Sequence, residues 1–183
     1  MAHPPLTGVL LVGGGSRRFG SPKALARLDG QTLAERGWRV LGEACEERLA
    51  VGKAADGLAL PFPLLDDGVE VRHPAAGIAA ALRVASTDVC VVLPVDCPAM
   101  TAAALRALGE ACADAAVPTD GGPLPGAFRR STLPALERCL AEGASLRRAL
   151  APLDVRRVAL DPRLTADVDT PEALAAIEAP QAG

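Results

Sequence analysis

Glycines and cations gather in one short segment near the start of the chain, LLVGGGSRRFGSPK at 10–23. Glycine lets the backbone approach a ligand closely and turns amide N–H groups towards it. Arg17, Arg18 and Lys23 add positive charge beside those amides. Amides and cations together suit a chain of phosphates, whereas a plain strand-to-helix turn needs only one of the three consecutive glycines. The segment therefore predicts a binding site for the phosphates of a nucleotide.

Two common phosphate-binding loops do not fit this segment. The P-loop pattern G-x-x-x-x-G-K-[ST] fits Gly15 and Gly20, but Ser21 stands where the lysine is required. The dinucleotide pattern G-x-G-x-x-G fits Gly13 and Gly15, but Arg18 stands at the third glycine, where close helix packing leaves no room for a long side chain. The pattern excludes a P-loop and disfavours an NAD site.

The elements that must position these residues alternate between strand-like and helix-like patterns. Apolar or extended runs predict strands at 8–12, 48–51, 61–65, 89–95, 114–118, 124–128 and 155–160. Helical spacing predicts helices at 32–44, 77–85, 101–113, 131–143 and 145–150, and a last helix that Thr170 caps with Pro171 in its first turn. This alternation is typical of an α/β fold with a mostly parallel sheet between two layers of helices.

Ligands of such sheets bind beyond the carboxyl ends of the strands, so the residues that follow each strand are the first candidates for chemistry. Four places qualify: the loop at 13–23, the pair Asp66 and Asp67, Asp96, and the acidic loop at 167–169. Asp96 follows the most apolar strand and lies between two prolines. Asp169 either joins Asp96 in one site or organises its own loop.

The composition excludes several classes of protein. The chain has 183 residues, half of them hydrophobic, which predicts one domain over 1–183. A net charge of −3 and 2% aromatic residues argue against binding a nucleic acid polymer. The apolar runs are too short for a membrane span and no leader pattern is visible, so we expect a cytoplasmic protein. Five dispersed cysteines without a C-x-x-C pair predict reduced thiols, and two distant histidines give no zinc pattern.

The opening segment fits the pattern L-x-G-G-x-S-x-R-[MF]-G-x-x-K and resembles the signature of nucleotidyltransferases that attach a nucleoside monophosphate to the molybdenum cofactor. Two further motifs of that family follow in order: LPVDCPAMT at 93–101 matches P-x-D-x-P, and ADVDTPEAL at 166–174 matches D-x-D-T-P. The double glycine followed by SRRFG looks most like the molybdenum cofactor guanylyltransferases, which are MobA-like nucleotidyltransferases. The similarity runs from about Gly8 to about Ile177. The residues that match the opening pattern are Leu11, Gly13, Gly14, Ser16, Arg18, Phe19, Gly20 and Lys23.

The resemblance implies a Rossmann-like three-layer α/β/α nucleotidyltransferase fold and a reaction. GMP would pass from GTP to the terminal phosphate of molybdopterin, with release of pyrophosphate and with Mg²⁺ as the metal. A phosphate monoester is already an adequate nucleophile, so catalysis should consist of charge neutralisation and positioning. For partners, the resemblance implies GTP and molybdopterin as substrates and leaves open an accessory GTP-binding protein and the molybdoenzymes that receive the product.

The resemblance also implies roles for single residues. Lys23 would pair with the nucleotide phosphates, Arg18 with the β- and γ-phosphates, and Asp96 with the metal. An aspartate of the family at the guanosine site is in register with Asp66. The candidate catalytic residues are therefore Arg18, Lys23 and Asp96, and the candidate nucleotide-binding residues are Leu11, Val12, Gly13, Gly14, Lys23, Asp66 and Asp96, with Asp96 as the metal ligand.

The chain departs from the family pattern at three places. In HPAAGI at 73–78, His73 and Ala75 replace the first glycine and the leucine of the family's G-P-L-A-G-[IM]. Val51 and Gly52 stand where many members have an asparagine. The third departure is the pair of aspartates in DVDTP at 167–171, which favours the cytidine-specific relatives and so CTP. The second glycine of the opening loop favours GTP.

Other readings stay open at this stage. Cytidylyltransferases of the molybdenum cofactor and sugar-phosphate nucleotidyltransferases use similar loops. A non-catalytic nucleotide-binding module would keep the glycines without needing Lys23 and Asp96 together, and a redox role would fall on Cys97. For an anionic pterin, the candidates are Arg129, Arg130, Arg147 and Arg148, which exposed helix-end charges explain as well.

Overall fold

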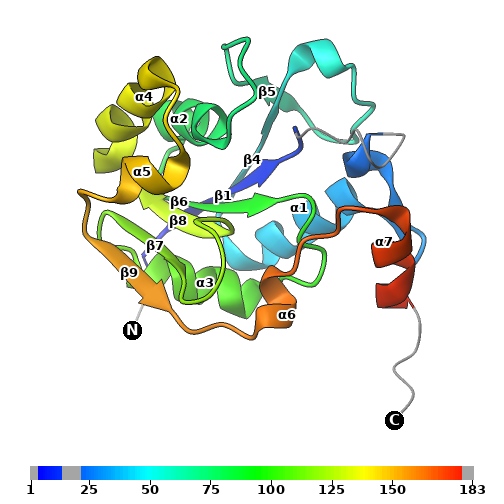
Figure 1. The fold of residues 1–183 in the computed structure, drawn as a ribbon. Helices are drawn as coiled ribbons and strands as arrows, with labels where there is room; N and C mark the ends of the chain where they lie inside the picture. Colours follow the sequence, from blue (N-terminus) through cyan, green and yellow to red (C-terminus); the bar gives the residue numbers. More distant parts are fainter. Residues whose placement is uncertain (1–3, 14–21, 179–183) are drawn as a thin grey trace.

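A computed structural model of the protein describes residues 4–13 and 22–178. A seven-stranded sheet runs through the middle of the molecule in the order β5-β4-β1-β6-β8-β7-β9 (Figure 1). The strands are β1 (Leu6–Leu11), β4 (Glu47–Gly52), β5 (Leu64–Asp66), β6 (Val89–Pro94), β7 (Ala115–Pro118), β8 (Gly126–Arg129) and β9 (Val155–Val158). A separate two-stranded hairpin pairs β2 (Arg27–Leu28) with β3 (Gln31–Thr32).

Helices cover both faces of the sheet, which confirms the predicted three-layer α/β fold (Figure 1). One layer holds α1 (Leu33–Ala44) and α3 (Ala102–Ala111), with α6 (Pro162–Thr165) and α7 (Pro171–Glu178) beside them. The other holds α2 (Pro74–Val84), α4 (Leu133–Glu142) and α5 (Leu146–Leu150). Short 3-10 turns lie at η1 (Lys23–Leu25), η2 (Ala54–Asp56) and η3 (Arg130–Thr132). None of the helices described is both long and apolar enough to cross a bilayer.

Strand direction decides which residues can meet at one edge of the sheet. β1 is parallel to β4 and β6, and β4 is parallel to β5. β8 is antiparallel to both β6 and β7, and β7 is parallel to β9. The sheet is therefore mostly parallel, as predicted, with one reversed strand. The carboxyl ends of all strands except β8 lie at the same edge.

The helix starts follow from local sequence. Thr32 caps α1 by accepting from the backbone N–H of Glu35 at 3.1 Å, and the Glu35 carboxylate accepts in return from the backbone N–H of Thr32 at 2.8 Å. Thr170 caps α7, as predicted, by accepting from the N–H of Ala173 at 3.2 Å. The β2–β3 hairpin was not predicted, because its strands are only two residues long and turn at Asp29 and Gly30, both with positive φ.

Helix α2 lies so close to the sheet that Gly77 has no room for a side chain. A Cβ there would lie 2.6 Å from Cδ2 of Leu11 and 3.6 Å from Val51. In α1, the three atoms nearest to a Cβ at Gly42 all belong to the guanidinium of Arg48, the far end of a flexible side chain that can move aside.

We expect Gly77→Ala to lower the free energy of unfolding by about 1–3 kcal/mol through overpacking. Gly42→Ala is the matched control, and it should be neutral or stabilising because alanine favours a helix. Urea unfolding of the two variants measures the difference, and equal stabilities would contradict the close packing of α2 on β1.

Candidate active site

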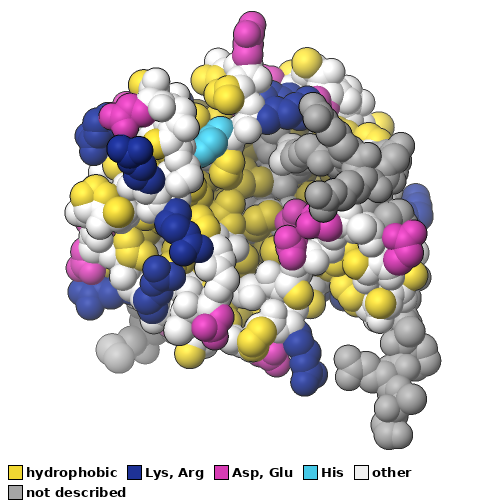
Figure 2. Space-filling model, in the orientation of Figure 1, with side chains coloured by type: hydrophobic (Ala, Val, Ile, Leu, Met, Phe, Trp, Pro, Cys, Tyr) yellow, Lys and Arg dark blue, Asp and Glu magenta, His cyan; other side chains and the backbone are white. Residues whose placement is uncertain are grey.

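A pocket of about 300 Å³ opens at the carboxyl edge of β1, β4 and β6, on the α2 face of the sheet. Figure 2 shows an apolar hollow in the molecular surface, with basic side chains on one side and acidic side chains on the other. A pocket of this size at this edge is where an α/β fold binds a small ligand. The residues that line it are Leu11, Gly13, Val51, Gly52, Lys53, Asp67, Arg72, His73, Pro74, Gly77, Pro94 and Leu124.

Three of the charged residues selected from sequence meet beside this edge. The ammonium group of Lys23 lies 2.9 Å from Oδ1 of Asp169 and 3.5 Å from Oδ2 of Asp96. Lys23 is at the start of η1, Asp96 follows β6, and Asp169 precedes α7. The backbone N–H of Val168 donates to the carbonyl of Asp96 at 2.8 Å, which ties the late acidic loop to the turn after β6. Segments far apart in sequence thus place two carboxylates around one cation.

The protonation of this cluster follows from its partial burial. The side chain of Lys23 is 12% exposed, that of Asp96 30% and that of Asp169 57%. Burial raises the pKa of Asp96, although the neighbouring Lys23 charge opposes the rise. For Lys23, burial would lower the pKa, but hydrogen bonding to Asp169 and the charges of Asp96 and Asp169 outweigh it and raise the pKa. A further cation beside Asp96 would therefore stabilise the ionised form of its carboxylate.

The nucleotide-binding residues predicted on the opening strand lie on two sides of the sheet. Leu11 and Gly13 line the pocket, whereas Val12 points into the core on the α1 face and is buried. The backbone N–H of Val12 donates to the carbonyl of Val51 at 3.0 Å, so it holds the edge of the sheet together. Gly14 and Arg18 lie outside the described residues.

Asp66 and Asp67 take different positions although they are neighbours. Both oxygens of Asp66 accept from backbone N–H groups, from Ala54 at 2.6 Å and from Gly68 at 2.7 Å, and these bonds lower its pKa. Asp67, one residue later, points to the α2 face and lines the pocket. The carboxylate of the pocket wall is thus Asp67, while Asp66 stays a prediction for the guanosine site.

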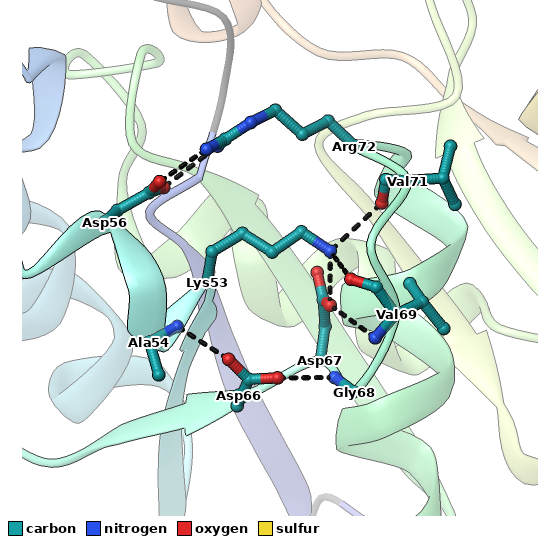
Figure 3. Close-up of polar contacts among 9 residues, drawn as sticks. All are labelled: Lys53, Ala54, Asp56, Asp66, Asp67, Gly68, Val69, Val71 and Arg72. Carbon is teal, nitrogen blue, oxygen red and sulfur yellow. Dashed lines mark hydrogen bonds and ion pairs between the residues drawn. The ribbon is translucent and has the colours of Figure 1, made fainter.

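Lys53 holds Asp67 in place, as Figure 3 shows. Its ammonium group donates to Oδ1 of Asp67 at 2.6 Å, to the carbonyl of Val69, and to the carbonyl of Val71 at 3.0 Å. All three protons of the ammonium are then used. An ion pair between Arg72 and Asp56 connects the same loop to η2 (Figure 3). The loop at 67–72 is therefore fixed to the end of β4.

One oxygen of Asp67 remains available to a ligand. Oδ1 also accepts from the N–H of Val69 at 3.2 Å, and in the described part of the chain nothing donates to Oδ2 (Figure 3). Asp67 is only 8% exposed, yet no fully buried side-chain oxygen or nitrogen of the described residues lacks a partner. Oδ2 therefore reaches open space, and the open space that Asp67 lines is the pocket.

Lys53 was not among the residues selected from sequence. The signal for it is its position directly after β4, at the same sheet edge as the other candidates. Gly52, the residue before it, cannot carry a side chain freely, because a Cβ there would lie 2.9 Å from Val12. His73, which replaces a family glycine, caps α2 by accepting at Nδ1 from the N–H of Ala75 at 3.1 Å, and it lines the pocket.

Two arginines suggested for a pterin lie at the opposite edge of the sheet. Arg129 ends β8, the reversed strand, and pairs in register with Val89 at the start of β6. It forms an ion pair with Asp88, and Arg130 donates to backbone carbonyls around the end of α2. Their position favours the alternative from sequence, that they are helix-end charges, because the reversed strand β8 carries them away from the pocket edge. Of the other two, Arg147 lines a second pocket.

Cys97, the candidate for a redox role, is buried beside Asp96. Burial raises the pKa of its thiol to about 12, and the negative charge of Asp96 adds to this. Burial likewise raises the pKa of Cys45 and Cys90 to about 12. A thiol that stays protonated is a weak nucleophile.

We expect iodoacetamide at pH 7.5 to leave Cys97 unlabelled in the folded protein and to leave the nucleotide transfer expected from sequence unchanged. Mass spectrometry of tryptic peptides measures the labelling, and the same reaction in urea is the control, in which all five cysteines should react. Rapid native labelling of Cys97 with loss of activity would instead support a role for its thiol.

Comparison with known proteins agrees with this geometry. Residues 8–158 match the model of the MobA-like NTP transferase domain. A probable molybdenum cofactor guanylyltransferase of Rhodopirellula baltica is 33% identical, over 93% of this chain and 90% of that protein. A molybdenum cofactor guanylyltransferase of Desulfosudis oleivorans is 30% identical, over 95% of each chain. The similarity to these relatives thus extends over nearly their whole length.

Solved structures show the same fold. Molybdopterin-guanine dinucleotide biosynthesis protein A of Archaeoglobus fulgidus superposes with a TM-score of 0.81 and 26% identity, over 94% of this chain and 96% of that one. A 2-C-methyl-D-erythritol 4-phosphate cytidylyltransferase of Thermus thermophilus superposes with a TM-score of 0.72 at 20% identity, which indicates a shared fold. Taken together, the domain match, the relatives and the fold show that the present chain belongs to the MobA-like nucleotidyltransferase family.

Proposed function

We propose that the protein is a molybdenum cofactor guanylyltransferase of the cytoplasm, acting as a single domain. It would transfer GMP from GTP to the terminal phosphate of molybdopterin and release pyrophosphate. The observation that carries this proposal is the meeting of Lys23, Asp96 and Asp169 next to a pocket that Asp67 lines. The relatives named as guanylyltransferases support the choice of substrates.

The reaction breaks one phosphorus–oxygen bond and forms another. An oxygen of the acceptor phosphate attacks the α-phosphorus of GTP, and the bond to the β-phosphate oxygen breaks, so that pyrophosphate leaves with that electron pair. No protein base is needed, because the attacking phosphate is already ionised. Lys23 would donate to the phosphates and offset their charge, and in our assignment Arg18 does so at the leaving pyrophosphate. Catalysis then consists of holding two anions in line.

Asp96 and Asp169 fit a divalent cation such as Mg²⁺. Both carboxylates converge on the same point, where Lys23 now supplies the positive charge. Within the described residues no three His, Cys, Asp or Glu side chains gather into a complete metal cage. Mg²⁺ needs no such cage, since one or two carboxylates suffice when phosphates and water complete its shell. When bound, the ion would neutralise phosphate charge, with Asp96 as its principal protein ligand.

Asp67 would select the base. Guanine presents two neighbouring N–H donors, N1–H and the N2 amino group, whereas cytosine presents a single donor, the N4 amino group, beside its acceptors at N3 and O2. A carboxylate is an acceptor only, so the Oδ2 oxygen of Asp67 suits the paired donors of guanine better than the single donor and neighbouring acceptors of cytosine. We therefore assign to Asp67 the contact that the sequence pattern suggests for Asp66.

Pyrophosphate release tests the proposal. With molybdopterin as acceptor, the protein should release pyrophosphate from GTP in the presence of Mg²⁺, and CTP should react at least tenfold less well. Chelation of divalent ions by EDTA should stop the reaction. A preference for CTP would identify a cytidylyltransferase, and absence of transfer with either nucleotide would reject the proposed reaction.

A further inference from the structure

Helix α2 brings the imidazole of His73 to the wall of the pocket that Asp67 lines. The helix joins β5 to β6, and these strands run in the same direction. A helix that joins two parallel strands starts at their carboxyl edge, so His73, directly before Pro74, lies at the edge where the nucleotide would bind. Because a glycine stands here in the family pattern, the imidazole is an addition made by this chain.

The start of α2 decides which ring nitrogen of His73 carries a proton. Nδ1 accepts from the backbone N–H of Ala75 at 3.1 Å. A ring nitrogen that accepts a hydrogen bond carries no proton, so the proton of the neutral imidazole is on Nε2. The same bond fixes the ring against the helix. His73 therefore presents Nε2–H as a donor in a fixed position.

This donor reaches open space. No described residue accepts a hydrogen bond from Nε2 of His73. Every fully buried side-chain nitrogen or oxygen in the described part of the chain has a partner, so Nε2 is not enclosed by protein. The side chain is only partly buried, and the open space that it lines is the pocket. A ligand in the pocket can therefore accept from Nε2–H.

The other charged side chains of the pocket wall are already engaged with protein groups. Lys53 uses its three protons on Asp67 and on the carbonyls at 69 and 71 (Figure 3). Arg72 directs both of its terminal nitrogens at Asp56 (Figure 3). Asp67 is an acceptor only. Among the described charged or titratable side chains that line the pocket, His73 is the one whose N–H points at no other protein group.

Guanine needs a donor of this kind when it turns its own donors towards Asp67. Its O6, N1–H and N2 amino groups lie in a row along one edge of the ring, so O6 enters the pocket together with the other two. The neighbouring walls are apolar, formed by Leu11, Val51 and Pro94 among others. A carbonyl oxygen buried there without a donor would weaken binding. Adenine carries an amino group at position 6 and would set one donor against another.

We propose that His73 is a specificity-determining residue whose Nε2–H donates to O6 of guanine, while Asp67 accepts from N1–H and N2. This inference rests on the proposed function, because that function supplies the nucleotide. It goes beyond it by adding a donor to the acceptor Asp67. The two side chains together recognise both kinds of group on one edge of the base, and they select guanine over adenine as well as over cytosine.

His73→Asn tests the inference, because asparagine is a good helix cap but places no N–H where Nε2 stood. The melting temperature should stay the same. We expect the Kd for GTP, measured by calorimetry without an acceptor, to rise about tenfold through the loss of one hydrogen bond. The variant should also lose about tenfold of its preference for GTP over ATP. With 6-thio-GTP, in which sulfur replaces O6 and accepts weakly, the unaltered protein and the variant should bind equally.

Two further variants separate the donor from the helix cap. His73→Ala removes both, so it should lower the melting temperature and raise the Kd for GTP as much as His73→Asn does. Ser145→Ala is the matched control. It removes a cap from α5, where Ser145 accepts from the N–H of Arg148 at 3.3 Å, and it does not line the pocket. We expect it to lower the melting temperature and to leave the Kd for GTP unchanged.

The outcomes distinguish this inference from the proposed function. If the unaltered protein transfers GMP and His73→Asn binds GTP as tightly as before, the contact is refuted and the function stands. An equal loss of affinity for GTP and 6-thio-GTP would also refute it, since the donor would then not meet O6. If the unaltered protein shows the expected binding changes but transfers GMP to no acceptor, the contact stands and the proposed function fails.

Discussion

Replacing Asp96 by alanine should lower the turnover of the proposed GMP transfer by about 10²- to 10³-fold, the size expected when a group that stabilises transition-state charge is removed. Its carboxylate is the one held between Lys23 and the end of β6. GTP should still bind, more weakly, because the pocket walls remain. The backbone carbonyl of Asp96 holds the loop at Val168, and alanine keeps this bond. The fold should therefore survive the change.

Single-turnover measurements with saturating GTP and Mg²⁺ give the rate, and nucleotide binding is measured separately. Asp169→Asn is the matched comparison: its carboxylate is more exposed than that of Asp96, so we expect a loss of about tenfold or less. Unchanged turnover in Asp96→Ala would show that the carboxylate of Asp96 takes no part in catalysis. A larger loss of turnover in Asp169→Asn than in Asp96→Ala would show that Asp169, and not Asp96, is the principal carboxylate of the site.

Replacing Asp67 by asparagine should reverse the choice of base. Lys53 and the N–H of Val69 are both donors to Oδ1, so the amide oxygen of asparagine would take that place. The amide NH₂ would then face the pocket where Oδ2 stood. It would meet the N–H donors of guanine unfavourably and the acceptors of cytosine favourably. With about 1.5–3 kcal/mol for each hydrogen bond to a charged group, the ratio of kcat/KM for GTP over CTP should fall by about 100-fold.

Asp66→Asn is the matched control for this experiment. It changes the neighbouring carboxylate in the same way but alters bonds to Ala54 and Gly68, outside the pocket wall. We expect a small loss of stability and no change in base preference, because Asp66 is exposed. Competition assays with GTP and CTP decide between the two residues. If Asp66→Asn loses the preference and Asp67→Asn keeps it, the assignment made from sequence is the correct one.

The fold could be predicted largely from local patterns. The order of strands and helices follows from apolar periodicity, and the motifs fall at strand ends because a parallel sheet presents its carboxyl ends at one edge. This is why Lys23 and Asp96 could be placed at one edge from sequence, whereas Asp169 was left with two alternative roles. The starts of α1 and α7 were visible as well, since their capping residues act within three positions. Such features depend on neighbours in the chain and need no knowledge of packing.

The sequence by itself determined the family, the order of elements and the sheet edge that Lys23 and Asp96 share, because these depend on motifs and on strand ends. Only the tertiary structure decided the roles that depend on side-chain direction and strand direction. Successive strand residues point to opposite faces, so Asp67 and not Asp66 lines the pocket. The reversal of β8 carries Arg129 to the far edge. No local pattern encodes the direction of a strand against partners that arrive from distant parts of the chain.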